Sequence, residues 1–225
     1  MIIEDDQISH ESHHHKLKLE DTNLPFRCDG CKVTGIGKRY TCDTCNFDLH
    51  KHCAVDPHTP ICHPLMPKCY NLQFCLSPPA NATHYCDACT KPVTGFLYRC
   101  ERCNFDLHPC CANLPMELED GDIKLKLIEK DRRWIYRSRC KKYKLEVACA
   151  REILEESSTE LMGSEMTTVP RIRNMLQTRH YKSRGSRVRN CCEMAGLALK
   201  IVISALLGDP RGLIIAVIAS FMPRA

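Results

Sequence analysis

Aromatic residues and long apolar runs are both scarce in this sequence. Only 6% of its 225 residues are aromatic, although 44% are hydrophobic in total. One large core needs large apolar side chains, so several small units that rely on a further stabiliser are the better expectation. No apolar run reaches the roughly 20 residues that span a bilayer. Residues 1–7 carry three acidic side chains in place of an export signal, and we therefore expect an intracellular protein, in cytoplasm or nucleus.

The motifs of the common enzyme classes are missing as well. The chain has no P-loop, no GxGxxG and no Ser, His and Asp arrangement of the kind that hydrolases use. A thiol oxidoreductase would use a Cys-x2-Cys pair at a helix N-terminus, but here four such pairs stand with histidines at fixed distances. We therefore expect no catalytic residues, no organic cofactor and no enzyme activity.

Cysteine is what the sequence has in abundance, with 18 residues. The pairs with histidines at set distances are typical of metal ligands in a reducing compartment, not of disulfides. The net charge of +5 counts cysteine as neutral. A zinc ion on three thiolates and one histidine carries −1, so three such sites would lower the total to about +2. The overall charge therefore says little about partners.

Two segments repeat each other with a constant offset of 58 residues, and each reads C-x2-C-x10-C-x2-C-x4-H-x2-C. The ligand-type residues of the first copy are Cys28, Cys31, Cys42, Cys45, His50 and Cys53. Those of the second copy are Cys86, Cys89, Cys100, Cys103, His108 and Cys111. Six ligand-type residues that agree twice indicate an internal duplication built around structural zinc. Tyr40, Phe47 and Leu49 alternate with the ligands, and we expect them to form the small core between the sites.

These residues resemble the cysteine-rich C1 domain of protein kinase C, and more closely the plant divergent C1 (cysteine/histidine-rich) family. The matching signatures are Phe-Asp-Leu-His-x2-Cys, Cys-Asp-x-Cys and Cys-Cys-Ala-Asn-Leu-Pro at Cys110 to Pro115. The resemblance implies small α+β modules in tandem, with short strands and one short helix each. It also implies two cross-braced zinc ions per repeat, and a non-enzymatic interaction module in intracellular signalling or in stress or defence response.

For the first repeat the resemblance implies two complete sets of ligands. The first set is Cys28, Cys31, His50 and Cys53. The second set is Cys42, Cys45, His15 in front of them, and Cys62 or His63 behind them. Because three histidines stand together, His13 and His14 compete for the role of His15.

For the second repeat the resemblance implies one complete set, which is Cys86, Cys89, His108 and Cys111. Cys100 and Cys103 need two further ligands. His63 is the leading candidate, and the closing position falls on Asp120, where the first repeat has Cys62. Carboxylates are uncommon in structural zinc sites. We therefore expect three zinc ions, and a fourth only if Asp120 serves as a ligand.

Residues 121–156 echo the end of each repeat. The segment Tyr143–Cys149 follows the pattern Phe-Asp-Leu-His-x2-Cys with Glu146 at the histidine position, and no C-x2-C pair precedes it. Alternate residues are apolar, as in strands: Trp134, Tyr136, Leu145 and Val147. We expect a degenerate third repeat without metal, packed on the second. The expected units are repeat 1 (10–62), repeat 2 (63–120), this third unit (121–156), a basic linker (157–190) and an apolar tail (191–225).

The last two segments differ from the rest in composition. Between Glu165 and Glu193 there is no acidic residue but there are seven arginines and lysines, which is typical of a solvated linker. Two apolar stretches follow, split by Gly208–Gly212, and they predict a helical hairpin. Such a hairpin packs on the zinc repeats, binds a partner or docks at a membrane interface. Cys191 and Cys192 are placed as a palmitoylated pair would be.

The sequence favours a protein partner over the alternatives. Anionic lipid at a membrane surface is the alternative for residues 171–222, and nucleic acid is less favoured because Tyr181 is the one aromatic residue in the basic run. Diacylglycerol is disfavoured because the loop between the two C-x2-C pairs has only ten residues in each repeat, although Phe96 and Leu97 are candidates for a modest apolar tip. A RING-type ubiquitin ligase needs a further C-x2-C pair, and none follows Cys53. A membrane-associated adaptor that uses the tail is the other functional alternative.

Overall fold

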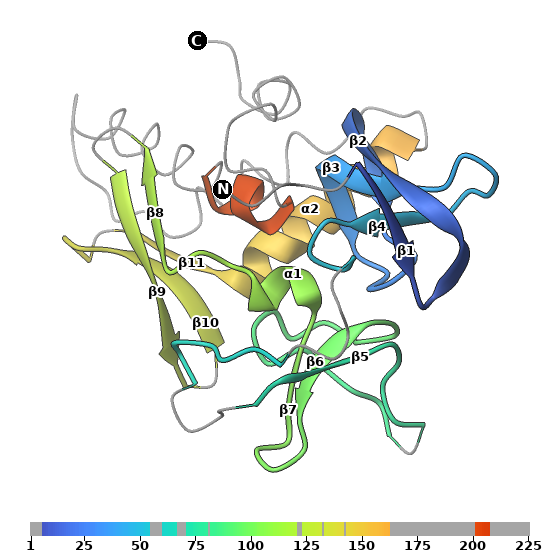
Figure 1. Ribbon diagram of the computed structural model, residues 1–225. Coiled ribbons are helices and arrows are strands. Elements are labelled where there is room, and N and C mark those ends of the chain that lie inside the picture. Colours follow the sequence, from blue (N-terminus) through green and yellow to red (C-terminus); the bar gives the residue numbers. More distant parts are fainter. Residues whose placement is uncertain are drawn as a thin grey trace, which may run out of the picture.

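The computed structural model describes residues 6–54, 60–66, 71–80, 82–120, 123–131, 133–141, 143–162 and 201–207. Within these ranges the chain forms three antiparallel sheets (Figure 1). They follow the first three expected units, except that the third sheet begins at Glu117, within the range expected for repeat 2. The expected linker beyond residue 162, the Cys191–Cys192 pair and most of the expected hairpin lie outside the described residues.

The first sheet has the strand order β1-β2-β3-β4. Its strands are β1 (Gln7–His10), β2 (His13–Arg27), β3 (Thr34–Thr41) and β4 (Asp48–His50). Strand β2 alternates in burial, since Leu17 is fully buried between the exposed Lys16 and Lys18. This period of two sends one face of the strand into the core and the other to solvent. The long β2 therefore forms the wall on which β1 and β3 pair.

The second sheet is smaller, with the order β5-β6-β7. Its strands are β5 (Gln73–Cys75), β6 (Leu97–Cys100) and β7 (Phe105–Leu107), followed by helix α1 (Pro109–Ala112). Proline at the first position suits a helix start because its φ is already fixed near the helical value. The first repeat has Lys51 at this position, and residues 51–53 form a turn instead of the expected short helix. Both versions keep one hydrogen bond, from Cys53 N to His50 O and from Cys111 N to His108 O, each 2.9 Å long.

The third sheet has the order β11-β10-β9-β8 and leads into the longest helix that the structure describes. Its elements are β8 (Glu117–Asp120), β9 (Ile123–Lys130), β10 (Arg133–Ser138), β11 (Lys144–Glu146) and α2 (Val147–Met162). Trp134 and Tyr136 point into the core as expected. The expectation that Val147 continues a strand was wrong: β11 ends at Glu146 and Val147 begins α2.

The three sheets share one register. The same pair of residue types faces across the last two strands of each unit: Tyr40 and Leu49, Tyr98 and Leu107, Tyr136 and Leu145. In each unit a turn or helix follows the last strand and carries a cysteine four residues after the paired leucine. The third unit is therefore a third copy of the same structural motif.

The first two units contact each other directly. Phe96 N of the second unit donates a 2.9 Å hydrogen bond to Gly30 O of the first. Neither Gly30 nor Gly95 has room for a Cβ atom, because each glycine lies against atoms of the other unit. The two glycines thus allow the backbones of the two units to approach closely.

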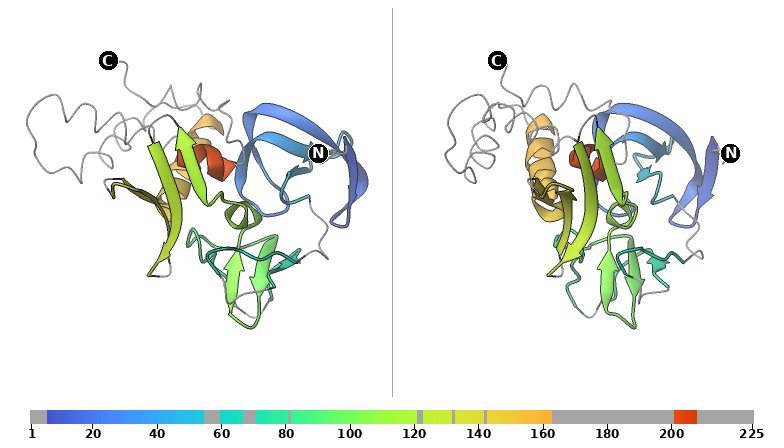
Figure 2. Two further views of the ribbon diagram at one scale, coloured as in Figure 1. Left: turned by 60° about the vertical axis from the view of Figure 1, so that its left-hand side comes forward. Right: turned by 90° about the vertical axis from the view of Figure 1, so that its left-hand side faces the viewer.

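Helix α2 lies among all three units. It contacts β3 of the first unit and β10 and β11 of its own, and the side chain of its Arg151 reaches the second unit (Figures 1 and 2). Residues 201–207 form a helix that both figures place beside α2. Val202 and Leu206 in this helix are fully buried and belong to the same core as the three sheets. None of the helices in the described ranges is both long and apolar enough to cross a membrane.

Candidate metal centres

Three groups of cysteine and histidine side chains converge in the described part of the chain, and we call them groups A, B and C. Group A is Cys28, Cys31, His50 and Cys53. Group B is Cys86, Cys89, His108 and Cys111. Group C is His13, His15, Cys42 and Cys45. In each group the four ligand-type atoms lie within 4.8 Å of one another.

Group A is assembled by a turn and a strand end. The C-x2-C turn between β2 and β3 supplies two thiols, the last residue of β4 supplies His50, and the following turn supplies Cys53. His50 Nδ1 lies 3.3 Å from the Sγ atom of Cys31 and 3.8 Å from that of Cys53. The backbone N–H of His50 donates to Cys28 Sγ at 3.4 Å. All four residues are buried, which shields the group from water.

Group B repeats this construction in the second unit. His108 Nδ1 lies 3.4 Å from Cys89 Sγ, while His108 Nε2 lies 3.1 Å from Pro92 O. A carbonyl only accepts, so Nε2 carries a proton and donates, which leaves Nδ1 as the nitrogen that faces the sulfurs. An outer hydrogen bond of this kind holds a ligating histidine in the tautomer and orientation that a metal needs.

The thiols of group B compete for ionisation. Hydrogen bonds from Cys111 and Cys86 lower the pKa of Cys89, whereas burial raises the pKa of Cys86. Burial opposes protonation of His108, but the negative charge of Cys86 beside it raises the pKa of the imidazole to about 11. Three buried thiols that compete for ionisation favour a bound cation, which would let all of them ionise together.

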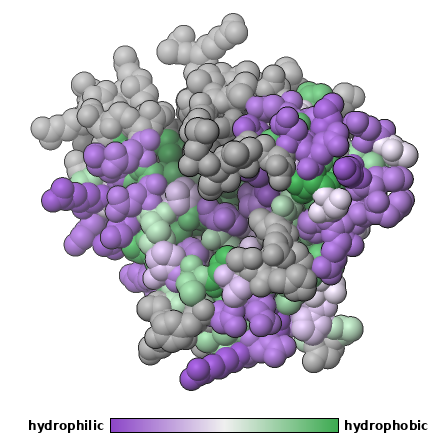
Figure 3. All heavy atoms as spheres, in the orientation of Figure 1, coloured by the Kyte–Doolittle hydropathy of each residue, from purple (hydrophilic) through white to green (hydrophobic). Residues whose placement is uncertain are grey.

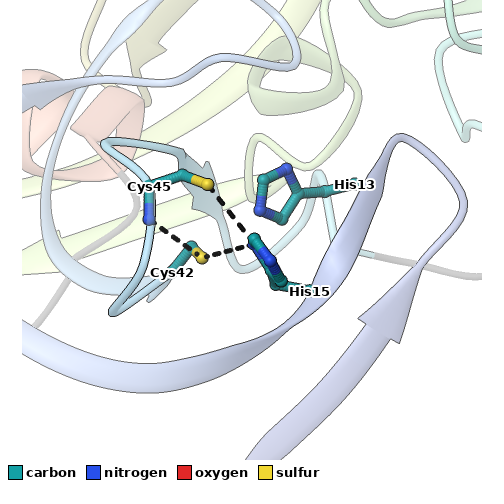
Figure 4. A group of neighbouring side chains, drawn as sticks. All are labelled: His13, His15, Cys42 and Cys45. Carbon is teal, nitrogen blue, oxygen red and sulfur yellow. Dashed lines mark hydrogen bonds between the residues drawn. The ribbon is translucent and has the colours of Figure 1, made fainter.

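Group C lies at the outer end of the first sheet (Figure 4). His15 Nδ1 is 3.3 Å from Cys45 Sγ and 3.6 Å from Cys42 Sγ. The Cys45 N–H donates to Cys42 Sγ at 3.3 Å, and the His13 ring stacks on Phe47 with 4.2 Å between centroids. Cys42 is buried, whereas the other three members are partly exposed. Group C is therefore the most accessible of the three.

The fourth member of group C differs from the prediction. We expected Cys62 or His63 to close this set and treated His13 as a competitor of His15, but the structure includes both histidines and neither of the later residues. His13 and His15 are two residues apart on β2, so their side chains leave the same face of the strand. Together with Cys42 and Cys45 these two histidines already supply four donors, so group C has no position left for Cys62 or His63.

Cys100 and Cys103 join none of the groups found among the described residues. Phe74 on β5 pairs with Tyr98 as Leu19 on β2 pairs with Tyr40, and counting back along the sequence from Phe74 aligns His13 and His15 with Lys68 and Tyr70. Those two residues lie outside the described ranges, and neither is a usual zinc ligand.

His63, the expected ligand of Cys100 and Cys103, lies elsewhere. Its ring packs on Trp134 of the third unit with 4.4 Å between centroids, and burial lowers its pKa to about 4. Cys62 is exposed, and the side chain of Asp120 is not among those described. The expectation of a histidine shared between the repeats was therefore wrong, because His63 is part of the core.

A pair of aspartates supports groups A and B, and our sequence analysis did not assign it. The carboxylate of Asp29 accepts a hydrogen bond from Asp48 N at 2.9 Å, and that of Asp87 accepts one from Asp106 N at 2.8 Å. Each bond ties the C-x2-C turn to the strand that leads to the histidine. The signal was present, because both aspartates recur at the 58-residue offset inside the motifs Cys-Asp-x-Cys and Phe-Asp-Leu-His.

The family model of the C1 domain matches the chain twice, at residues 11–54 and at residues 67–112. The two repeats are C1 domains. Groups A and C belong to the first C1 domain and group B to the second. The third unit lies outside both matches, although its sheet keeps the C1 register. No curated protein and no solved structure matches the chain.

The loop of the second C1 domain has no exposed apolar tip. Phe96 is 5% exposed and Leu97 is fully buried. The Phe96 ring packs at 5.4 Å from that of Phe74 and also lies against Gly30 of the first C1 domain. The loop is thus packed, and part of that packing joins the two C1 domains.

The third unit replaces a thiol of the C1 domains by a hydroxyl. Ser138 occupies the position of Cys42, since Ser138 N donates to Tyr143 O at 3.0 Å as Cys42 N does to Phe47 O. The Ser138 hydroxyl accepts a further hydrogen bond from Tyr143 N at 3.0 Å. A hydrogen bond therefore closes the turn that a metal ligand occupies in the C1 domains.

Proposed function

We propose that this chain is a non-enzymatic zinc-binding interaction module that acts in intracellular signalling or in stress or defence response. In this proposal zinc holds the C1 domains in the shape that a protein partner recognises. The observation that carries it is the completeness of groups A and B, each of which presents three thiols and one imidazole in a buried pocket of side chains.

The donors of the three groups fit zinc. Thiolate sulfur and imidazole nitrogen, four to a group, are the donors of structural tetrahedral zinc sites. Oxygen-binding cations such as Mg²⁺ and Ca²⁺ prefer carboxylates and carbonyls, and none of the groups contains either. A catalytic zinc site keeps one position for water or substrate, whereas four protein donors fill the tetrahedron. These features support a structural role for the metal.

The surface supports a protein partner better than diacylglycerol. Hydrophilic side chains make up most of the coloured part of the face drawn in Figure 3, and the large hydrophobic residues that are exposed in the described ranges are Leu24 and Tyr85. Phe96, the candidate for an apolar tip, packs between the C1 domains. We therefore propose recognition through polar side chains and not through insertion into a lipid bilayer.

Metal analysis of the purified full-length chain tests the zinc proposal. We expect about three zinc ions per chain, one for each group of donors, and loss of the folded state on chelation, because structural zinc contributes on the order of 10 kcal/mol to folding. His14→Ala serves as the control, since His14 neighbours two members of group C without being one. A chain that contains no zinc, or that stays folded after complete chelation, would contradict the proposal.

Binding assays with the same full-length chain test the partner proposal. The zinc-loaded chain is expected to retain a protein partner that the chelated chain loses, and to stay in solution when mixed with diacylglycerol vesicles in a flotation assay. Flotation with diacylglycerol would instead favour a lipid ligand. Flotation with anionic vesicles lacking diacylglycerol would favour the membrane-associated adaptor.

A further inference from the structure

Helix α2 brings a buried cation to the metal centre of the second C1 domain. Arg151 is 1% exposed, and a guanidinium keeps its charge in proteins. Its Nη2 atom donates to Cys110 Sγ at 3.0 Å and lies 3.7 Å from Cys111 Sγ. Cys111 is a member of group B, so the positive charge lies directly beside that group.

The usual partner of a buried arginine is missing here. Among the described residues no carboxylate forms an ion pair with Arg151, and its Nε and Nη1 atoms have no hydrogen-bond partner. A buried charge without an opposite charge is strongly destabilising. Within the part of the chain that the structure describes, the sulfur atoms of Cys110 and Cys111 are the groups in contact with Arg151 that can carry negative charge, so its placement fits a site with ionised thiols.

Charge counting gives the same result. Zinc bound to three thiolates and a neutral histidine carries a net charge of about −1. Cys110 is not a ligand, and with it counted as a neutral thiol one guanidinium beside Cys111 brings the buried total to about zero. Hydrogen bonds to ligating sulfurs and to other ligand atoms also orient a metal site and tune its affinity.

Further contacts hold α2 in this position. Lys91 Nζ of the second C1 domain pairs with Glu155 at 3.1 Å and with Glu152 at 3.8 Å, both on α2. Lys91 belongs to the C-x2-C turn of group B, since its carbonyl accepts the hydrogen bond of Cys86 N at 2.9 Å. The helix thus contacts a group B sulfur through Arg151, and through its two glutamates it contacts Lys91, whose backbone is hydrogen-bonded to Cys86.

We propose that Arg151 is the counter-charge of the group B metal centre, and that metal binding in the second C1 domain and docking of α2 therefore stabilise each other. The proposal rests on the proposed zinc occupancy of group B. The third unit has lost its own metal ligands, but in this proposal it still has a role. It supplies Arg151, which contacts the neighbouring metal site without being one of its ligands.

The experiment compares zinc affinities of full-length variants by competition with a chromogenic chelator. The signal of group B is identified as the one that Cys89→Ser removes. Arg151→Met keeps much of the side-chain volume but removes the charge, and we expect it to weaken zinc binding at group B by roughly 10- to 100-fold, as loss of an outer partner does in other metal sites. Group C, which Arg151 does not touch, is expected to keep its affinity.

Two further variants separate charge from packing. Arg151→Lys keeps the charge and is expected to retain most of the affinity that Arg151→Met loses. Arg133→Met removes a cation from the same unit that is 61% exposed and pairs with Glu146, and we expect wild-type affinity. Equal weakening by Met and Lys at position 151 would overturn the proposal, and so would wild-type affinity in Arg151→Met.

A measurement on α2 covers the case in which Arg151→Met does not fold. Hydrogen exchange at residues 147–154 is expected to accelerate in Cys89→Ser, which empties group B, and to stay slow in the zinc-loaded wild type. Unchanged exchange would overturn the coupling. Absence of zinc from group B of the wild type would contradict the proposed function itself, and this result is visible before any variant is made.

Discussion

His50 reaches the thiols of group A because the residue that faces its ring, Gly35 on β3, has no side chain. A Cβ atom at Gly35 would overlap the Nε2 atom of His50 and the ring of Phe26. In the second C1 domain the same position is Val93, and His108 is held by the carbonyl of Pro92 instead. The two domains therefore orient equivalent histidines by different means.

Gly35→Ala is expected to remove the metal of group A. The added methyl group displaces the imidazole of His50, and a donor set with three members binds zinc far more weakly. Metal analysis should show about one zinc ion fewer per chain than the wild type. Thr34→Ala, the neighbouring position on β3, is the matched control. Full zinc content in Gly35→Ala would show that the ring has room to move.

His63 predicts a pH dependence of stability. Burial lowers its pKa from 6.5 to about 4, so the unfolded chain takes up a proton between these values that the folded chain does not. The contribution of neutral His63 is complete above pH 6.5 and is lost as the pH falls toward 4.

The comparison with His63→Phe isolates this effect. Phenylalanine keeps a ring against Trp134 but takes up no proton. Between pH 7 and 5.5 the wild type should lose about 1 kcal/mol of unfolding free energy more than the variant. Lower pH would protonate the zinc ligands, so denaturation curves are compared within this range and in excess zinc, where both chains keep their metal. Parallel pH profiles would contradict the assignment.

The members of groups A and B could be predicted from the sequence because the spacing that identifies them is local. Within each C1 domain one turn, one strand end and the turn or helix that follows it supply all four ligands. Group C depends on the pairing of β2 with β3, which brings His13 and His15 to the distant Cys42 and Cys45. To choose His13 over His63 as a member of group C, one would have to know that the His63 ring packs on Trp134. The local sequence pattern does not contain that information.

At the scale of elements, the third unit shows what remains of this motif without metal. The Tyr136–Leu145 register, β11 and the helix after it are all retained, while Ser138 stands where a ligand would be. The sequence predicted the strands from alternating apolar residues. It did not predict that α2 begins at Val147, because an alternating apolar residue also suits the buried first turn of a helix.

Ser138→Ala is expected to loosen the turn between β10 and β11. The variant leaves Tyr143 N without its 3.0 Å side-chain acceptor, which costs about 1 kcal/mol of unfolding free energy. Amide exchange at Tyr143 should accelerate at the same time. Arg139→Ala, an exposed neighbour, controls for the loss of a side chain in the same turn. Stability and exchange equal to those of the wild type would argue against the hydroxyl as a substitute for metal.

At the scale of the whole molecule, residues from all three units and from residues 201–207 form a single core. Leu206 is fully buried, although it belongs to a segment for which the sequence left three environments open. Hydropathy alone marks such a segment as apolar. It does not distinguish packing within the chain from packing on a partner or a membrane, because the same side chains suit all three.

Leu206→Ala tests this packing. A leucine truncated in a closed core costs about 3 kcal/mol through lost transfer energy and the cavity left behind. Ile201→Ala, at a partly buried position of the same helix, should cost less. Chemical denaturation of the full-length chain measures both. An unchanged unfolding free energy in Leu206→Ala would mean that the segment does not contribute to the core in solution.

The hydrogen bond between Gly30 and Phe96 has a consequence for recognition. It fixes the distance and the angle between the two C1 domains, so they do not act as two independent binding sites joined by a flexible linker. A partner that contacts both domains must present its two epitopes at that one spacing. The affinity gained by binding both domains at once then depends on the spacing of the epitopes, because a ligand with the right chemistry but the wrong spacing can engage only one domain at a time.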